Sequence, residues 1–339
     1  MNNRANPSVA GMAQISLAID PEVETERIVM AMREQLRHTL KRRGLVLGLS
    51  GGVDPSVCAA LAARAAGAAK VLCIFMPEND SDPESLRLGR LVADTFGIES
   101  VVEDIGPSLE AMGCYARRDA YIRQIEPEFG PGWASKIVIA GDLDGEGYNI
   151  SYLVLRRPDG TTGKLRMPGP VYRGIVAATN MKQRTRKQVE YYHADRMNYA
   201  VIGTPILLEY DQGFFLKNGD GAADLKPIAH LYKSQVYQLA AYLGVPEEIT
   251  SRPPTTDTYQ LAQTQEEFYF ALPYHQMDQC LYGLNESLPA AVTAAWMAWR
   301  RSDRHEALSH SRGLGGSRRI DQRHGALDGR RQRRVLQRP

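Results

Sequence analysis

The sequence predicts an α/β fold, a doubly wound parallel sheet that carries a β-hairpin insertion and a disordered C-terminal tail. Short apolar runs alternate with helical patterns in the N-terminal third of the 339 residues, which is typical of parallel strands covered by helices on both faces. In the middle of the chain, strand-like segments flank the turn sequence Pro158-Asp159-Gly160, which indicates a hairpin. After about Trp299 the hydrophobic periodicity ends, so the last segment cannot bury a core of its own.

The first helix is expected from Pro21 to about Arg43, because apolar residues recur on one face and Gly44 follows a basic run. The next elements, in chain order, are a strand at 45–49, a helix ending at Ala66, a strand at 70–76, a helix at 83–96 and a strand at 100–105. Later elements are a basic helix at about 180–197, a strand at 199–203, a Gly- and Asp-rich loop to Asp224, a helix at 230–243 and two helical pieces at 263–284 around Pro273.

We expect three regions in the chain. Residues 1–20 form a flexible N-terminus, residues 21–299 form the α/β domain, and residues 300–339 form the Arg-rich tail. The domain is interrupted by an insertion at about 113–172, in which short strands are expected at 136–140, 148–157 and 163–167.

Composition excludes several classes of protein. With 43% hydrophobic and 24% charged residues, the chain has no stretch near the roughly 20 apolar residues that span a bilayer. The N-terminus lacks the apolar region of a secretion signal, which favours a cytoplasmic protein. Four cysteines, Cys58, Cys73, Cys114 and Cys280, lie far apart without a CxxC pair, so neither a disulfide framework nor a zinc site is indicated.

The net charge of +2 conceals an asymmetry between the body and the tail. Residues 300–339 contain 12 Arg and 4 acidic residues, which leaves the body at −6. The basic balance therefore does not indicate a nucleic-acid platform. Disorder is the favoured interpretation of the tail. A nucleic-acid-binding arm is less favoured because no aromatic residue stands among the arginines, and a segment that is not native coding sequence is a third possibility.

The strongest local signal is GLSGGVDPSV at Gly48–Val57, between a predicted strand and a predicted helix. Consecutive glycines let the backbone approach a ligand closely, and the N–H groups at the start of a helix form an anion site. Asp54 fits such a site if it holds Mg²⁺ against phosphate oxygens. The alternative is a tight turn with Asp54 as a helix cap, and the Walker A pattern is missing. The expected nucleotide-binding residues of this loop are Gly48, Leu49, Ser50, Gly51, Gly52, Val53, Asp54 and Pro55.

This loop resembles the SGGxDS signature of the ATP pyrophosphatases, which cleave ATP between its α and β phosphates. The resemblance implies an adenine nucleotide α-hydrolase-like, Rossmann-like fold. The chain departs from the signature at Pro55, where the family usually has Ser. Proline suits the first turn of a helix, but it removes a hydroxyl and a backbone N–H that would grip pyrophosphate.

Later segments resemble the NAD synthetase family, of the ammonia-dependent type. Gly203-Thr204 with Glu209 matches a GT…E segment, and GFFLKNGDGAADLKP follows from Gly213. Leu243-Gly244-Val245-Pro246 and the PPTTD stretch at 253–257 match further segments. The resemblance covers about residues 22–110 and 178–284.

The resemblance implies roles for individual residues. Thr204 and Thr255 contact ATP, Lys233 lies against the ATP phosphates and acts in catalysis with Asp54, and Asp54 and Glu209 hold Mg²⁺. Three further residues are implied to contact deamido-NAD⁺: Arg184, Lys217 and Asp224. Simpler interpretations also exist. Lysines are usually solvated, and aspartates beside glycine favour turns. Arg184 stands in a run of charges that is typical of a solvent-exposed helix face.

The implied reaction joins ammonia to a carboxylate at the expense of ATP, with an acyl-adenylate intermediate, and the family assembles as homodimers. The short segment before the first helix leaves no room for a glutaminase domain, so free ammonia or a partner protein is expected to supply the nitrogen. Three alternatives stay open. They are a relative that amidates another carboxylate, such as a sugar acid or a biosynthetic intermediate; a tRNA-modifying enzyme, which the acidic body disfavours; and an inactive nucleotide-binding homologue, which Pro55 makes conceivable.

Overall fold

The computed structural model describes residues 16–140, 150–253, 259–261, 273–294 and 296–297. The chain divides into two compact units, of which residues 19–273 form the larger, and residues 274–339 together with 1–18 form the smaller. The larger unit contains the parallel sheet and all the sites discussed below. The predicted tail at 300–339 and most of the predicted flexible N-terminus lie outside the described residues.

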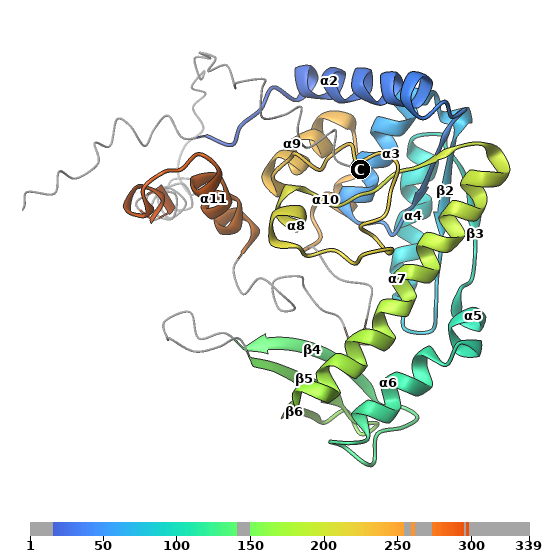
Figure 1. The fold of residues 1–339 in the computed structure, drawn as a ribbon, viewed down its shortest axis with the longest axis vertical. Helices are drawn as coiled ribbons and strands as arrows, with labels where there is room; N and C mark the ends of the chain where they lie inside the picture. Colours follow the sequence, from blue (N-terminus) through green and yellow to red (C-terminus); the bar gives the residue numbers. More distant parts are fainter. Residues whose placement is uncertain (1–15, 141–149, 254–258, 262–272, 295, 298–339) are drawn as a thin grey trace, which may run out of the picture. The chain divides into compact units, whose positions relative to one another are not determined.

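A four-stranded parallel sheet organises the larger unit (Figure 1). Its order is β3-β2-β1-β7, and every neighbouring pair runs parallel. The two inner strands consist almost entirely of buried apolar residues, as a sheet covered on both faces requires. The strand bounds are β1 Leu45–Gly48, β2 Val71–Phe75, β3 Glu99–Val102 and β7 Ala200–Val201. The predicted α/β fold with a parallel sheet is therefore confirmed.

Alternate residues of the strands face different helices. Val46, Ile74 and Val201 belong to one apolar cluster with Ala194 of the long helix α7. Phe75, next to Ile74 in the strand, points to the opposite face, where its ring lies against Gly89 of α4. Helices thus cover both faces, which is the doubly wound arrangement that the sequence predicts.

Helix boundaries follow local sequence signals. Asp20 caps α2 by accepting hydrogen bonds from the amides of Glu22 and Val23, and Asp82 caps α4 by accepting one from the amide of Glu84. The helices on this part of the chain are α2 Pro21–Glu34, extended by a π-helical turn at Gln35–Thr39, α3 Val53–Ala66 and α4 Pro83–Thr95, with a 3₁₀ turn at Ala68–Lys70. The later helices are α8 Leu207–Gln212, α9 Lys233–Leu243 and α10 Glu247–Thr250.

The long helix α7 corrects the sequence prediction. It runs from Gly169 to Met197, whereas the pattern predicted a start near Asn180. Pro170 in the first turn is compatible with a helix start, and Gly174 lets the ring of Tyr121 pack against the helix backbone, since a Cβ there would lie 2.4 Å from that ring. Apolar residues of the added turns pack on the middle region of the chain, and this burial overrides the weak local pattern.

The middle region, residues 106–166, contains two short helices and a separate antiparallel sheet. The hairpin is confirmed, because β5 pairs with β6 in antiparallel register, and β4 adds a third strand. The buried face of this antiparallel sheet, which includes Ile137 and Leu153, forms an apolar cluster with Ile122 of α6 and Ile175 of α7. The element bounds are α5 Gly106–Ala111, α6 Cys114–Ile122, β4 Ala134–Ala140, β5 Ile150–Arg156 and β6 Thr162–Arg166. The two helices were not predicted from the sequence.

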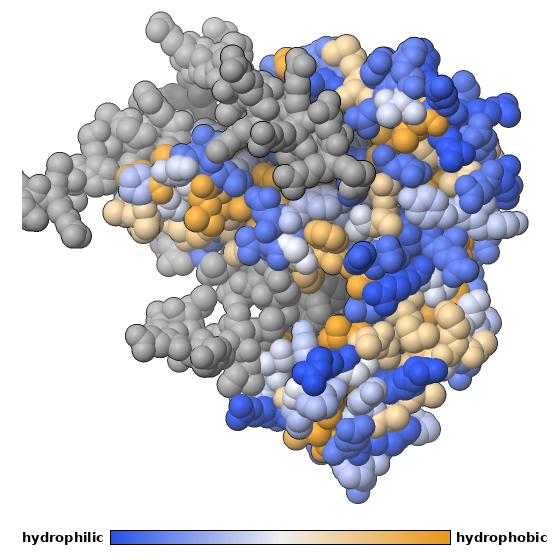
Figure 2. All heavy atoms as spheres, viewed as in Figure 1, coloured by the Kyte–Doolittle hydropathy of each residue, from blue (hydrophilic) through white to orange (hydrophobic). Residues whose placement is uncertain are grey.

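The smaller unit contains α11 at Tyr274–Asn285, which agrees with the second predicted helical piece after Pro273; the first piece lies outside the described residues. Trp296 of this unit is buried and meets the ring of Tyr282. In the described part of the chain, no helix combines the length and the apolar character that a membrane crossing needs. On the face drawn in Figure 2, hydrophobic side chains form small groups separated by hydrophilic ones.

Candidate active site

A cavity of about 690 Å³ opens at the carboxyl ends of β1 and β2. Ligands of open parallel α/β sheets bind at this edge of the sheet. Its walls come from the 48–55 loop, the segment from Ile74 into α4, one side of α7, and the segments around Thr204 and Phe215. The cavity therefore collects most of the segments that the sequence singled out as nucleotide-binding.

The 48–55 loop, which we call the phosphate loop, is held in one conformation by close packing. Gly51 has φ +76°, and a Cβ at this position would lie 2.5 Å from Cβ of Leu88. The loop ends in α3, whose first turn contains Val53, Asp54 and Pro55. Pro55 is compatible with the helix, because the N–H that it lacks would have no partner within the first turn. All eight residues predicted for this loop line the cavity.

Lys233 reaches the loop from the first position of α9. Its ammonium donates to both carboxylate oxygens of Asp54, at 2.8 and 2.6 Å, and its side chain is only 2% exposed. Burial alone would lower the pKa of Lys233, but the charge and hydrogen bonds of Asp54 raise it overall, so the lysine is a permanent cation. The predicted catalytic pair is thus in direct contact inside the cavity.

Glu209, in α8, places a second carboxylate in the same cavity. Burial and the negative charge of Asp54 raise its pKa, and Lys233 opposes that rise only in part. One oxygen accepts a hydrogen bond from the amide of Ile206 at 2.8 Å. Asp54 and Glu209 thus line one cavity, as a shared cation requires.

The donor set of Asp54 and Glu209 suits Mg²⁺. Hard oxygen ligands are what this ion takes, and it usually keeps waters and substrate phosphates in its remaining positions. Burial first, and then the charge of Asp54, raise the pKa of Glu209, and a bound cation would favour its ionised form. No group of three or more His, Cys, Asp or Glu that could hold a metal ion occurs within the described ranges.

The other residues predicted for the site divide into three groups. Thr204 lines the cavity, and Thr255 lies outside the described residues. Arg184, Lys217 and Asp224 are exposed and are not among the lining residues. Arg184 donates to the carbonyl of Lys217 at 3.4 Å, whereas Asp224 accepts from the amide of Val201 at 2.8 Å and ties the loop to the sheet. The cavity accordingly contains the predicted ATP side, and the three substrate contacts stay a prediction.

Sequence reasoning missed a buried charge pair in the wall formed by α7. Lys187 donates to Glu190 at 2.7 Å, both side chains are less than a tenth exposed, and both line the cavity. Glu190 lies directly against the phosphate loop, since a Cβ on Gly48 would be 2.9 Å from its Oε1. The only available signal was the spacing of three residues between opposite charges within a predicted helix, and such pairs usually face water.

Comparisons with known proteins agree with this geometry. The family model described as NAD synthase matches residues 24–125 and 171–296. A protein named NH(3)-dependent NAD(+) synthetase from Rhizobium meliloti is 70% identical over 290 residues, 86% of each chain. A protein of the same name from Thermotoga maritima is 31% identical over 264 residues, 77% of this chain and 87% of that one.

Solved structures share the fold. An NMN synthetase from Francisella tularensis has a TM-score of 0.57 at 23% identity, with 89% of this chain and 100% of that chain covered. An NAD⁺ synthetase from Burkholderia pseudomallei has a TM-score of 0.51 at 24% identity, with 89% and 95% covered. At this level of identity the similarity concerns the fold alone.

Proposed function

Because the chain belongs to the NAD synthase family, we propose that its cavity is the active site of an ammonia-dependent NAD⁺ synthetase. In this reaction ATP transfers AMP to the carboxylate of deamido-NAD⁺ with release of pyrophosphate, and ammonia then displaces AMP to give NAD⁺. The observation that carries the proposal is the contact of buried Lys233 with Asp54 at the phosphate loop, with Glu209 in the same cavity.

The first step needs an activated acyl group, because a carboxylate delocalises its charge and resists nucleophiles. The start of α3 presents backbone N–H groups and partial positive charge to the triphosphate. Lys233 offers an ammonium that is held in place before substrate arrives, and it can offset the charge that develops on the leaving pyrophosphate. These groups act by positioning and electrostatics, and no covalent enzyme intermediate is needed.

Asp54 and Glu209 are the residues that would hold Mg²⁺, which supplies positive charge against the phosphate oxygens when it is bound. The magnesium requirement belongs to the proposal, and it is supported by the two carboxylates that share the cavity.

The second step requires ammonia to reach the acyl-adenylate while water is excluded. Phe214, Phe215 and Leu216 supply an apolar stretch to the cavity wall, next to the Gly- and Asp-rich loop. Such a stretch limits hydration of the intermediate. Arg184, Lys217 and Asp224 are proposed to contact deamido-NAD⁺, on the basis of the family resemblance.

Two further parts of the proposal concern the setting of the enzyme. We take it to be cytoplasmic and to assemble as a homodimer, because the residue pattern resembles a family with these properties. Chromatography coupled to light scattering tests the second point, since a monomer at the concentrations that support turnover would contradict it.

The decisive experiment follows the products. Purified protein is incubated with ATP, Mg²⁺, ammonium and deamido-NAD⁺, and NAD⁺, AMP and pyrophosphate are quantified. One equivalent of each product is expected per turnover, and no repeated turnover when any single reactant is omitted; without ammonium, at most one pyrophosphate per active site is released as the acyl-adenylate forms. A panel of other carboxylates tests the acceptor, and faster turnover of another acid would reassign the substrate. Absence of pyrophosphate release with every acceptor would leave only a nucleotide-binding role.

A further inference from the structure

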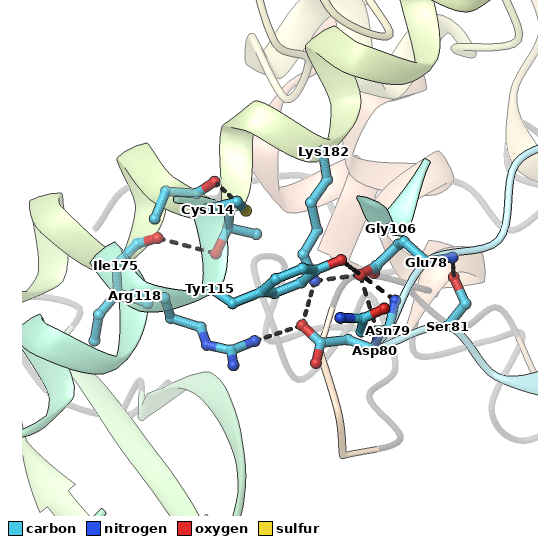
Figure 3. Close-up of polar contacts among 12 residues, drawn as sticks. Glu78, Asn79, Asp80, Ser81, Gly106, Cys114, Tyr115, Arg118, Ile175 and Lys182 are labelled. Carbon is cyan, nitrogen blue, oxygen red and sulfur yellow. Dashed lines mark hydrogen bonds and ion pairs between the residues drawn. The ribbon is translucent and has the colours of Figure 1, made fainter. Parts of the chain in front are cut away.

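A buried ion cluster joins three separate segments at the wall of the cavity, which one of its members, Glu78, lines. Lys182 of α7, 1% exposed, donates to Oε1 of Glu78 at 3.0 Å and to Oδ2 of Asp80 at 2.5 Å. Arg118 of α6 pairs with the same oxygen of Asp80. The hydroxyl of Tyr115, also on α6, donates to Oε2 of Glu78 at 2.8 Å, and Figure 3 shows these side chains converging between the helices and the loop. We call these five residues the wall cluster.

The wall cluster is thoroughly bonded. Its two carboxylates face two cations, its charged side chains are each no more than 7% exposed, and Arg118 also pairs with the carboxylate of Asp119 at 2.8 Å. Taking four ionised groups out of water is costly, and apolar residues of similar volume would often be as stabilising. A satisfied buried network fixes one geometry, however, because any displacement leaves a charge without its partner. The cluster is therefore suited to holding a segment in place.

The segment held in this way is the loop at 76–82, between β2 and α4. Its backbone is bonded to the cluster: the amide of Asp80 donates to Glu78 Oε2 at 3.0 Å, and the amide of Asn79 donates to the hydroxyl of Tyr115 at 3.3 Å. Residues of this loop, including Met76 and Ser81, line the cavity. A loop at this edge of a sheet would otherwise be open to local motion.

The loop also leads into the helix that supports the phosphate loop. A Cβ on Gly51 would lie 2.5 Å from Leu88 of α4, and a Cβ on Gly89 would lie 3.1 Å from the carbonyl oxygen of Leu49. The side chain of Met76 likewise comes within 2.9 Å of where Gly48 would carry a Cβ. A shift of the 76–82 loop would consequently be transmitted to the site that takes the ATP phosphates.

We propose that the wall cluster positions the 76–82 loop and, through α4, the phosphate loop for ATP binding. Its members act through the loop and are positioning residues. The inference rests on the proposed function in taking ATP as the ligand. The antiparallel sheet lies in the part of the chain between the two segments that the family model matches. Ile122 of α6 packs into the apolar cluster of this sheet, so the sheet supports the ATP site through α6.

The test uses a matched pair of tyrosines on α6. Tyr115→Phe removes only the hydroxyl that bonds Glu78 and the amide of Asn79. Tyr121→Phe, the control, removes a hydroxyl from a ring that packs against Gly174 and does not line the cavity. We expect Tyr115→Phe to raise the Kd of ATP with Mg²⁺ in calorimetry by about fivefold, as the loss of one net hydrogen bond implies, with kcat at saturating ATP within twofold. Hydrogen exchange of amides 78–81 should quicken in this variant only.

A second variant pair separates charge from fold. Arg118→Leu should weaken ATP binding by roughly tenfold or more, and Arg118→Lys should recover most of it because the positive charge beside Asp80 is kept. The proposal is overturned if Tyr115→Phe and Arg118→Leu bind ATP within twofold of the native protein, or if kcat falls with Kd unchanged, the sign of a smaller folded fraction. Lack of turnover by the native protein would refute only the proposed reaction. The Kd of ATP and the hydrogen exchange of amides 78–81 would still test the role of the wall cluster.

Discussion

Replacing Gly51 by alanine is the sharpest test of how the phosphate loop is built. The backbone there has φ +76°, a region that costs an alanine about 1–2 kcal/mol. The new Cβ would also lie 2.5 Å from Cβ of Leu88 and 3.0 Å from the amide nitrogen of Gly89. Since Leu88 is a buried part of α4, it cannot swing away freely, and such overpacking costs about 1–3 kcal/mol.

Gly97 provides a matched control. It also has positive φ, +63°, but a Cβ there would meet nothing within 4 Å. Gly97→Ala should therefore show the same backbone cost without the overlap, about 1–2 kcal/mol, and Gly97 does not line the cavity. We expect Gly51→Ala to lose about 2–5 kcal/mol in total, from the two costs added.

Two assays follow the pair of variants. The midpoint temperature of thermal unfolding should fall by roughly 2–4 °C for each kcal/mol of stability lost. The Tm of Gly51→Ala should therefore lie clearly below that of Gly97→Ala. The kcat/KM for ATP, from pyrophosphate release, should fall by about 10–100-fold in Gly51→Ala, as expected when one charge-assisted hydrogen bond is misaligned, and should be unchanged in Gly97→Ala. Equal melting temperatures for the two variants would refute the packing argument, and an unchanged kcat/KM would show that this turn does not grip the nucleotide.

Three other changes test the site and the fold. Lys233→Met should lower kcat by about 10²–10³-fold in the pyrophosphate assay, as removal of a preorganised charge typically does, whereas Lys226→Met, outside the cavity, should leave kcat near native. Pro55→Ser adds a hydroxyl and an N–H at the cavity and should lower the KM of ATP several-fold, about the worth of one hydrogen bond; an unchanged KM would mean that this position does not face phosphate. Glu24 is surrounded by protein, which raises its pKa, but hydrogen bonds from His230 and Arg27 outweigh this and lower it from 4.5 to about 2. The contribution of ionised Glu24 to the free energy of unfolding is therefore complete above pH 4.5 and is lost as the pH falls towards 2. In urea unfolding at pH 7, Glu24→Gln should lower that free energy by about 1–2 kcal/mol, after allowance for partial exposure. The loss should be clearly smaller at pH 3.5.

The parallel sheet could be predicted because its signals are local. The inner strands are uninterrupted apolar runs, and proline or aspartate marks the start of α2 and α4. The residues of the phosphate loop were predictable for the same reason, since Gly51 and Asp54 stand between a clear strand and a clear helix. Such features depend on chemistry within a few residues, which a single sequence displays directly.

The features that were not predicted depend on contacts between distant segments. The first turns of α7 carry a weak pattern, because Val171 and Ile175 face the antiparallel sheet and not the parallel one. Lys182 reads as one member of a basic run in the sequence. It lies buried because Glu78 and Asp80, about a hundred residues earlier, come to meet it, and no local rule predicts that a lysine finds two carboxylates across the fold.

On the proposed function, Lys233 and Asp54 both meet the triphosphate at the phosphate loop. Lys233 donates one hydrogen bond to each oxygen of Asp54, and each oxygen keeps a second lone pair with which it can bind a cation. The ammonium is buried, and leaving it without an anion would cost several kcal/mol, but phosphate oxygens at the adjacent loop offer it a replacement. The pair therefore holds the lysine in position, and Lys233 can donate to the triphosphate while Asp54 binds the cation. Nucleotide and cation should accordingly bind with mutual dependence, each strengthening the affinity for the other by the same factor.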